Sequence, residues 1–181
     1  DDNLHAQRLY HYISNLWFMP ATPVLSNAGT ERGLPISCFL NEASDSLEGI
    51  VDLWSENVWL AAKGGGIGSY WGSLRSIGEK VGRVGKTSGI VPFIKVMDSL
   101  TLAISQGSLR RGSAACYLQI DHPEIEEFIE MRRPTGGDPN RKALNLHHGV
   151  LVTDEFMRAV ETDGAVSYTH LTLPTIRLVD L

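Results

Sequence analysis

Apolar residues recur at helical spacing in several segments of the chain, as amphipathic helices require. The pattern predicts helices over residues 3–18, 47–62, 92–104 and 123–133, and a last short helix that begins after Thr153. In the segment 123–133, glutamates stand in the first turn and arginines in the last, so each charge matches the helix dipole at its end.

Four short apolar runs alternate with these helices and predict strands over residues 36–40, 67–73, 114–120 and 147–152. The run 114–120 is continuous, which is typical of a strand buried on both faces. Strands that alternate with helices form a parallel sheet with crossover helices. The predicted fold class is therefore α/β, with an N-terminal helix.

Three stretches with little periodicity are expected to be loops, at residues 20–35, 78–89 and 106–112. Each contains glycine, and the first also contains prolines. No internal repeat is visible along the chain.

The last residues differ from everything before them. The sequence VSYTHLTLPT at 166–175 resembles one reading frame of a common DNA-sequencing adapter. We therefore expect residues 165–181 to be non-native, after a helical lead-in segment at 1–20 and the main α/β region at 21–164.

Composition narrows the classes of function. The formal net charge is −5, from 16 basic and 21 acidic residues, so no basic field exists for binding a nucleic-acid backbone. No apolar run is long enough to predict a membrane span. The chain has only two cysteines, too few for a disulfide-stapled secreted fold, so we expect a reducing, cytoplasmic location.

Cys38 follows Ser37 at the start of a predicted strand, just after a loop rich in proline and glycine. Parallel α/β proteins often carry reactive groups on such loops. A lone cysteine is nevertheless more often a small buried apolar residue, so position alone leaves both interpretations open. Cys116 lies inside an apolar run and is interpreted as a packing residue.

Residues 64–66 are three consecutive glycines, and Gly68 follows closely. Such a run lets the backbone approach a ligand and adopt positive φ. It lacks the Lys-Ser or Lys-Thr of a Walker loop, and it follows a predicted helix rather than the strand of a dinucleotide fingerprint. A helix end with a tight turn and a ligand-facing backbone both remain open.

Other candidate groups are less specific. Asp45, with Glu48 three residues later, predicts a helix N-cap. His147 and His148 are adjacent on a predicted strand and would point to opposite faces, so no metal site is predicted. Basic residues gather around two glycine-bearing loops, where they suit phosphate binding or simple solvation: Arg75, Lys80, Arg83, Lys86, Arg110 and Arg111.

Taken jointly, residues 10–164 resemble the large subunit of ribonucleotide reductase. The resembling stretches are MPATPVLSNAGTE at 19–31, PISCFLNE at 35–42, DSLEGI at 45–50, KGGGIGSYWGSLRSIGE at 63–79, SQGSLRRGSAA at 105–115 and DHPEIEEFIE at 121–130. Several separate motifs in the same order are more specific than any single glycine loop.

The resemblance implies the first half of a ten-stranded α/β barrel built from two five-stranded halves. It implies reduction of ribonucleoside diphosphates to 2′-deoxyribonucleotides by a cysteine thiyl radical, with a thiol pair supplying the electrons. Cys38 matches one thiol of that pair, whereas Cys116 does not match the other. The implied substrate-binding residues are Thr22, Ser37, Cys38, Gly65 and Gly66.

The resemblance also implies an allosteric site for a dNTP or ATP. Asp45, with Ser46 and Leu47, matches an effector site at the start of a dimer-interface helix, and Arg75 matches a ligand of the effector phosphates. The loop 106–112 matches a second specificity loop, in which Gln106 and Arg111 (or Arg110) would face the base.

No residue matches the radical cysteine, the second redox thiol, the relay tyrosines or the C-terminal shuttle cysteines. The resemblance thus implies a fragment that binds no cofactor and is inactive alone. Residues 105–115 and 144–149 favour the oxygen-dependent type, in which a metal-containing small subunit supplies the radical, thioredoxin or glutaredoxin the electrons, and large subunits form homodimers. An adenosylcobalamin-dependent reductase and a non-enzymatic nucleotide-binding module are the alternatives.

Overall fold

The computed structural model describes the whole chain except residues 1–2, 32, 84, 107–109, 168–174 and 178–181. It also leaves undescribed the side chains of residues 105–106, 110–111, 166–167 and 175–177. The chain divides into two compact units, residues 1–37 and 38–181, and each is described by itself.

The first unit contains two helices, α1 (Asn3–Ser14) and α2 (Thr22–Asn27). Helix α1 ends earlier than predicted, and Leu16 just beyond it has a left-handed φ of 59°. The prediction of a loop throughout 20–35 was wrong, because α2 lies within it. A proline in the first turn of α2 suits that position, where its missing N–H removes no intrahelical bond.

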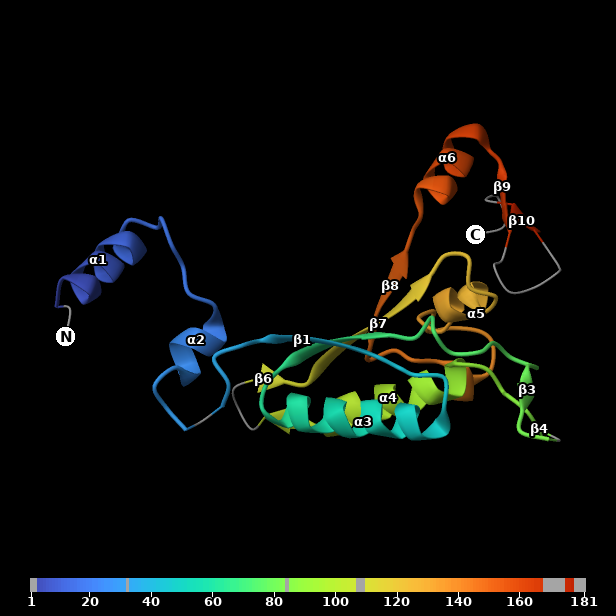
Figure 1. The fold of residues 1–181 in the computed structure, drawn as a ribbon, viewed down its shortest axis with the longest axis horizontal. Helices are drawn as coiled ribbons and strands as arrows, with labels where there is room; N and C mark the ends of the chain where they lie inside the picture. Colours follow the sequence, from blue (N-terminus) through green and yellow to red (C-terminus); the bar gives the residue numbers. More distant parts are fainter. Residues whose placement is uncertain (1–2, 32, 84, 107–109, 168–174, 178–181) are drawn as a thin grey trace. The chain divides into compact units, whose positions relative to one another are not determined.

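The second unit is built on a four-stranded sheet, which Figure 1 shows with its crossover helices. The strands are β1 (Cys38–Glu42), β2 (Gly66–Tyr70), β7 (Ser113–Gln119) and β8 (His147–Leu151), in that order and all parallel. The connecting helices are α3 (Leu47–Ala62), α4 (Val91–Ala103) and α5 (Ile125–Glu130). The predicted α/β class with a parallel sheet and crossover helices is confirmed.

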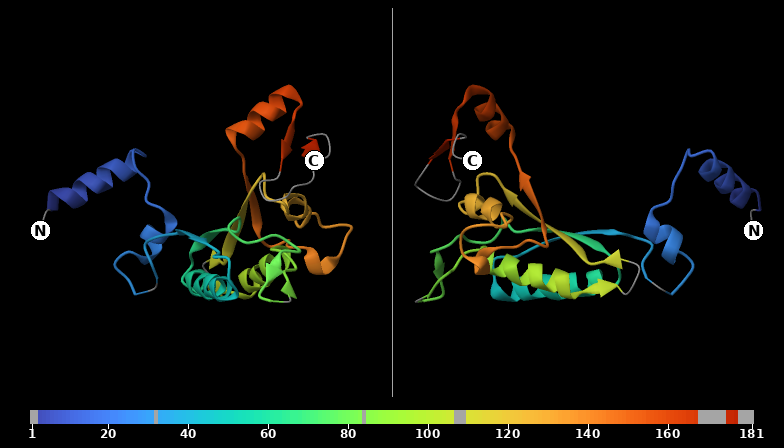
Figure 2. Two further views of the ribbon diagram at one scale, coloured as in Figure 1. Left: turned by 45° about the vertical axis from the view of Figure 1, so that its right-hand side comes forward. Right: turned by 180° about the vertical axis from the view of Figure 1, so that it is seen from behind.

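Helices α3 and α4 pack side by side on one face of the sheet (Figures 1 and 2). Their apolar stripes bury residues such as Ile50, Leu53 and Ile94 against the strands. A polar triad crosses this core. Asn41 Nδ2 donates to Asn57 Oδ1 (2.8 Å), Asn57 Nδ2 donates to Ser69 Oγ (3.2 Å), and Ser69 Oγ donates to Asn41 Oδ1 (2.7 Å).

Each polar atom in this triad has a partner, so it fixes α3 against β1 and β2 without an unsatisfied buried group.

The opposite face of the sheet is open. On β1 the side chains of Cys38, Leu40 and Glu42 are exposed, and Leu40 is 85% exposed. On β7 buried residues alternate with exposed or half-buried ones. The prediction that this strand is buried on both faces was therefore wrong, because its apolar run has helices over one face only.

The remaining elements are short. The predicted loop 78–89 contains a hairpin of β3 (Lys80–Val81) and β4 (Gly85–Lys86). The predicted loop 106–112 contains β6 (Arg110–Arg111) and begins at the last residue of its partner β5 (Ser105–Gln106). A 3₁₀ turn spans Pro139–Arg141.

Thr153 caps the last helix, α6 (Asp154–Thr162), as predicted, because its hydroxyl accepts the Phe156 N–H (3.1 Å). Strands β9 (Ala165–Ser167) and β10 (Thr175–Arg177) pair antiparallel in the segment whose non-native origin stays a prediction. Within the described residues, no helix is long and apolar enough to cross a membrane.

A buried carboxylate on α4 holds the segment that leads into β8. Asp98 is 2% exposed and accepts hydrogen bonds from the Asn145 N–H (2.7 Å), the Leu146 N–H (3.1 Å) and the Asn145 side-chain amide (2.9 Å). We predict that Asp98→Ala lowers the free energy of unfolding by about 3 kcal/mol, because buried donors lose their acceptor. Urea denaturation followed by circular dichroism measures this.

The matched control is Lys95→Met, because the Lys95 ammonium lies 3.9 Å from Asp98 and is partly exposed. This change should alter stability by less than about 1 kcal/mol. Equal effects of the two substitutions would contradict the anchoring role of Asp98.

Candidate functional site

The amino end of the β1–β2 pair is set by how α3 ends. Gly64, in the left-handed region at φ 81°, donates its N–H to the Ala61 carbonyl (2.9 Å), and the next residue, Gly65, donates to the Leu60 carbonyl (2.9 Å). These two bonds form a Schellman motif, for which glycine is the favoured residue at the left-handed position. The helix-end interpretation of the triple glycine is therefore confirmed.

The absence of a side chain at Gly65 has a packing reason. A Cβ atom there would lie 2.8 Å from the Phe39 ring and 3.1 Å from the Leu60 carbonyl oxygen. Close packing against β1 thus requires glycine at this position, whether or not a ligand also approaches it.

Cys38 and Gly66 lie in register on adjacent parallel strands. Gly66 is also in register with Ser113 on β7, so the three residues form one row at the amino edge of the sheet. The Cys38 side chain is exposed on the open face. Two other predicted substrate residues, Thr22 and Ser37, belong to the first unit and are not placed relative to this row.

Cys116 is a packing residue, as predicted. It is fully buried on the helix-covered face, and its thiol donates to the His147 carbonyl (3.5 Å). Burial raises the pKa of the Cys116 thiol to about 12, because the apolar surroundings disfavour the thiolate.

His148 lies beside this strand, and burial lowers its pKa to about 4. Among the described residues, no three His, Cys, Asp or Glu side chains come together as metal ligands.

The carboxyl end of the same strand pair carries an ion pair between Asp45 and Arg75. Arg75 Nε lies 2.9 Å and 3.0 Å from the two carboxylate oxygens, and Arg75 Nη2 lies 2.9 Å from Asp45 Oδ2. The Arg75 backbone N–H also donates to this carboxylate (3.2 Å), and Arg75 Nη1 donates to the Lys80 carbonyl (2.7 Å). The hydrogen bonds from Arg75 lower the pKa of Asp45.

Asp45 does not cap α3, so that prediction was wrong by one residue. The N-cap is Ser46, whose hydroxyl accepts the Gly49 N–H (3.0 Å). A hydroxyl at this position satisfies one of the orphan amides of the first turn. The Asp45 carboxylate is therefore left to face Arg75.

The ion pair forms part of the wall of a cavity of about 560 Å³. Four predicted effector residues line it together, namely Asp45, Ser46, Leu47 and Arg75. Sequence reasoning had singled out Lys86 as one of several loop cations but missed the rest of the wall, which consists of Ile50, Leu74, Val81, Gly82, Gly85, Thr87, Ser88, Gly89, Ile90 and Phe93. No local motif marks these residues, which come from three separate segments.

The electrostatics of this cavity suit an anion with an apolar part. The first turns of α3 and α4 both border it, at Leu47 and Ile90, and helix N-termini carry partial positive charge. Lys86 adds a positive charge, whereas the charge of Arg75 is balanced by Asp45, and Phe93 and Leu74 supply apolar surface. Two further predicted effector residues, Gln106 and Arg111, have backbones in β5 and β6, but their side chains lie outside the described part of the chain.

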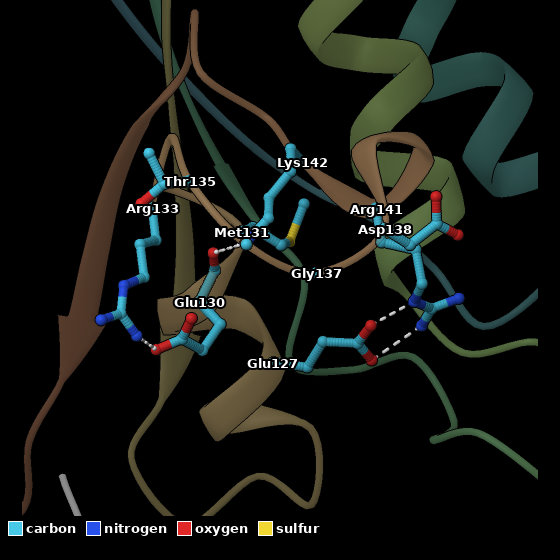
Figure 3. Close-up of a pocket in the computed structure, with 10 residues that line it drawn as sticks. Glu127, Glu130, Met131, Arg133, Thr135, Gly137, Asp138, Arg141 and Lys142 are labelled. Carbon is cyan, nitrogen blue, oxygen red and sulfur yellow. Dashed lines mark hydrogen bonds and ion pairs between the residues drawn. The ribbon is translucent and has the colours of Figure 1, made fainter.

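A second cavity of about 540 Å³ lies between α5 and residues 133–142, and Figure 3 shows its charged lining. None of the predicted site residues lines it. Its basic groups have partners on the protein, because Arg141 is paired with Glu127, Arg133 with Glu130 (3.4 Å), and Lys142 Nζ donates to the Glu130 carbonyl (3.0 Å). These mutual contacts account for the charges without a ligand.

Comparisons with known proteins match this chain to one family. Residues 36–177 match the family described as ribonucleotide reductase, barrel domain, and residues 1–33 match ribonucleotide reductase, all-alpha domain. The two matches meet near the division between the two units of the structure. The predicted boundaries at residues 20 and 164 stay predictions.

The chain is 46% identical over 160 residues to the ribonucleoside-diphosphate reductase large subunit of Invertebrate iridescent virus 3, covering 88% of this chain and 24% of the relative. It is 34% identical over 166 residues to the ribonucleoside-diphosphate reductase subunit alpha of Chlamydia muridarum, covering 91% of this chain and 16% of the relative. The chain thus spans less than a third of the relatives it matches.

Among solved structures, the class Id ribonucleotide reductase alpha subunit of Actinobacillus ureae superposes with a TM-score of 0.74 at 30% identity. The match covers 87% of this chain and 28% of that one.

The two cysteines should differ sharply in reactivity, because only the thiolate is nucleophilic and only Cys38 is exposed. We predict that iodoacetamide at about pH 8 modifies Cys38 in the folded chain and leaves Cys116 unmodified. Mass spectrometry of the intact chain and its peptides measures this. Cys38→Ser should abolish labelling, whereas urea should expose Cys116. Equal labelling of both thiols without denaturant would contradict the burial of Cys116.

Proposed function

Because the chain belongs to the ribonucleotide reductase large-subunit family, we propose that it is a part of a ribonucleoside-diphosphate reductase that carries one redox thiol and most of an effector site. The observation that carries this proposal is the pairing of two sites on one strand pair. Cys38 lies in register with Gly66 at one end, and the Asp45–Arg75 cavity lies at the other.

In the proposed reaction a ribonucleoside diphosphate loses its 2′ hydroxyl as water and gains hydrogen at C2′. Two thiols supply the two electrons and two protons and become a disulfide. Cys38 is one of these thiols. Cys116 is unsuited as its partner, because it is buried on the helix-covered face while Cys38 is exposed on the open face. The second thiol and the thiyl radical therefore come from elsewhere in the complete subunit.

The proposed substrate contacts are the hydroxyls of Thr22 and Ser37, the thiol of Cys38 and the backbone at Gly65 and Gly66. Support comes from the exposure of Cys38 beside main chain without side chains. The radical would be supplied by a separate metal-containing small subunit, and a thioredoxin or glutaredoxin would reduce the disulfide. The names of the relatives, which are large or alpha subunits, support the two-subunit arrangement over the cobalamin-dependent alternative.

The proposed effector is a deoxynucleoside triphosphate or ATP. Asp45 is suited to accept a sugar hydroxyl, because its lowered pKa keeps it ionised, and Arg75 is suited to share its guanidinium between that carboxylate and phosphate oxygens. Leu74 and Phe93 offer apolar surface to the base. Gln106 and Arg111 are proposed to relay effector identity to the substrate.

Helix α3 is the proposed contact between two large subunits. Leu47, Val51 and Trp59 are exposed on it and lie at multiples of four residues, which places them along one side of the helix. An exposed apolar row of this kind suits the same row on a second copy.

The reductase proposal is tested by replacing the matching segment of the Invertebrate iridescent virus 3 large subunit with residues 1–164 of this chain. With its small subunit and a dithiol reductant, the chimera should form deoxynucleotides. Cys38→Ser should reduce that activity to background, because one reducing thiol is lost. The matched control is Cys116→Ser, which should retain activity. Equal activity of the two variants, or an inactive but folded chimera, would contradict the proposal.

The effector proposal is tested by equilibrium dialysis of the full chain with ATP and each dNTP. We expect Arg75→Gln to bind the preferred nucleotide roughly tenfold or more weakly, because charge-assisted hydrogen bonds to phosphate are lost. The control is Arg133→Gln, an arginine of the second cavity, which should bind like the wild type. The same affinity in both variants would refute the site.

A further inference from the structure

A buried carboxylate lies directly behind the Asp45–Arg75 cavity. Glu124, on the turn between β7 and α5, is only 4% exposed. It occupies the N-cap position of α5, yet its side chain makes no capping bond there. Its Oε2 instead accepts the Ile77 N–H (3.0 Å), and the Ile90 N–H is shared between Oε1 (3.1 Å) and Oε2 (3.3 Å). The sequence predicted that Glu124 interacts with the dipole of its own helix. Its carboxylate instead contacts the Ile77 and Ile90 amides.

The neighbouring His122 is 1% exposed and orients this turn. Its Nδ1 lies 3.1 Å from the Glu124 N–H, and its Nε2 lies 3.4 Å from the Leu74 carbonyl oxygen. Because a backbone N–H can only donate, Nδ1 must be the unprotonated acceptor in this arrangement. The neutral tautomer with hydrogen on Nε2 satisfies both contacts.

These bonds reach both walls of the cavity. Leu74 and Ile90 line it, and Ile77 follows the cavity-lining Arg75 by two residues. Ile90 is also the N-cap residue of α4. One turn therefore contacts the wall that follows β2 and the wall that precedes α4, two segments that are also joined by the β3–β4 hairpin and by backbone hydrogen bonds of Thr87 with Gly78 and Glu79.

Gly89 packs closely against the Glu124 carboxylate. Gly89 has a φ of 85°, and a Cβ atom at this position would collide with the Glu124 carboxylate. The glycine thus allows the cavity wall to close onto Glu124, which no larger residue would permit without displacing it.

We propose that Glu124, oriented by His122, is a positioning residue that bridges the two walls of the effector cavity, so that nucleotide binds tightly only while both amides are held by its carboxylate. This inference rests on the proposed effector site and adds to it a residue that does not touch the ligand.

The bridge is strongest with an ionised carboxylate, because both oxygens then accept and hydrogen bonds to a charged acceptor are the stronger ones. Burial raises the pKa of Glu124 to about 7, against the opposing effect of the Ile90 and Ile77 amides. The charged groups around it are Glu127 on α5, which raises its pKa, and Arg141, which lowers it. Glu79 is held by the Ser76 N–H and hydroxyl. On protonation one oxygen becomes a donor, so the two amides share a single acceptor oxygen of a neutral group and both hydrogen bonds weaken.

The affinity for nucleotide should therefore increase with pH. Above a pH of about 7 the bridge is complete and affinity for nucleotide should be highest. As the pH falls through that value, Glu124 becomes protonated and its hydrogen bonds to the two amides weaken. The affinity for nucleotide should therefore decrease. Phosphate ionisation of the ligand adds its own pH dependence, so the difference between two variants is the useful quantity.

The test compares the full wild-type chain with Glu124→Gln, using dTTP, dGTP, dATP and ATP in equilibrium dialysis from about pH 5.5 to pH 8.5. At the upper pH the variant should bind roughly tenfold more weakly, because its amide group offers one acceptor instead of two. In the wild type, part of the change of nucleotide affinity with pH should be centred near the pKa of Glu124. This part should be absent in the variant. The matched control is Glu130→Gln on the same helix, which should keep the wild-type affinity and pH profile.

The outcomes separate the two proposals. If the wild-type chain binds none of these nucleotides, the effector site fails and this inference fails with it. If the wild type binds and Glu124→Gln shows the same affinity and pH profile, only the bridging role is overturned. Should Glu124→Gln not fold by circular dichroism, Glu124→Asp decides. If Glu124→Asp binds nucleotide more weakly than the wild type and its affinity still varies with pH, the bridging role is supported. If Glu124→Asp binds nucleotide with wild-type affinity, the bridging role is overturned.

Discussion

The parallel register between β1 and β2 is the constraint on which both candidate sites depend. Pairing Cys38 with Gly66 also pairs Glu42 with Tyr70 at the other end of the strands. Asp45 then follows β1 by three residues and Arg75 follows β2 by five. A slip of one residue would turn every side chain of a strand to the other face and would separate these partners. One register therefore positions a thiol at one end and an ion pair at the other.

Helix α3 maintains this register by being fixed at both ends and in the middle. Ser46 begins the helix, the Gly64–Gly65 turn ends it, and Asn57 ties its middle to both strands through Asn41 and Ser69. Five strand residues extend roughly 16 Å, which separates the two sites by about that length. The sheet between them is packed by helices on one face, so two continuous strands join Cys38 to the Asp45–Arg75 cavity.

The sequence predicted the parts of the fold that have strong local signals. Helix α3 was predicted with its observed end and with an N-cap one residue too early, because its apolar period is regular and both ends carry capping residues. Helix α2 was missed, because a segment of six residues with a proline in its first turn is too short to show a period. The burial of β7 was overestimated, since an apolar run does not reveal how many of its faces are covered.

The candidate site could be predicted from sequence only in part, because its geometry depends on contacts between distant residues. Family motifs led to Asp45, Arg75 and Cys38, but not to the wall at Thr87–Gly89. Glu124 stands in the first turn of a helix that carries further glutamates, and its local setting predicts a favourable interaction with that helix. Only the folded chain shows that its carboxylate bonds to amides 34 and 47 residues away.

The division of two tasks between neighbouring residues has a consequence for substitutions at position 45. Ser46 starts the helix with its hydroxyl, and Asp45 beside it is available to face Arg75. A change of charge at position 45 would therefore disrupt the ion pair with Arg75 without removing the cap that begins α3. The charge lining this end of the sheet and the start of the helix are thus set by two different side chains.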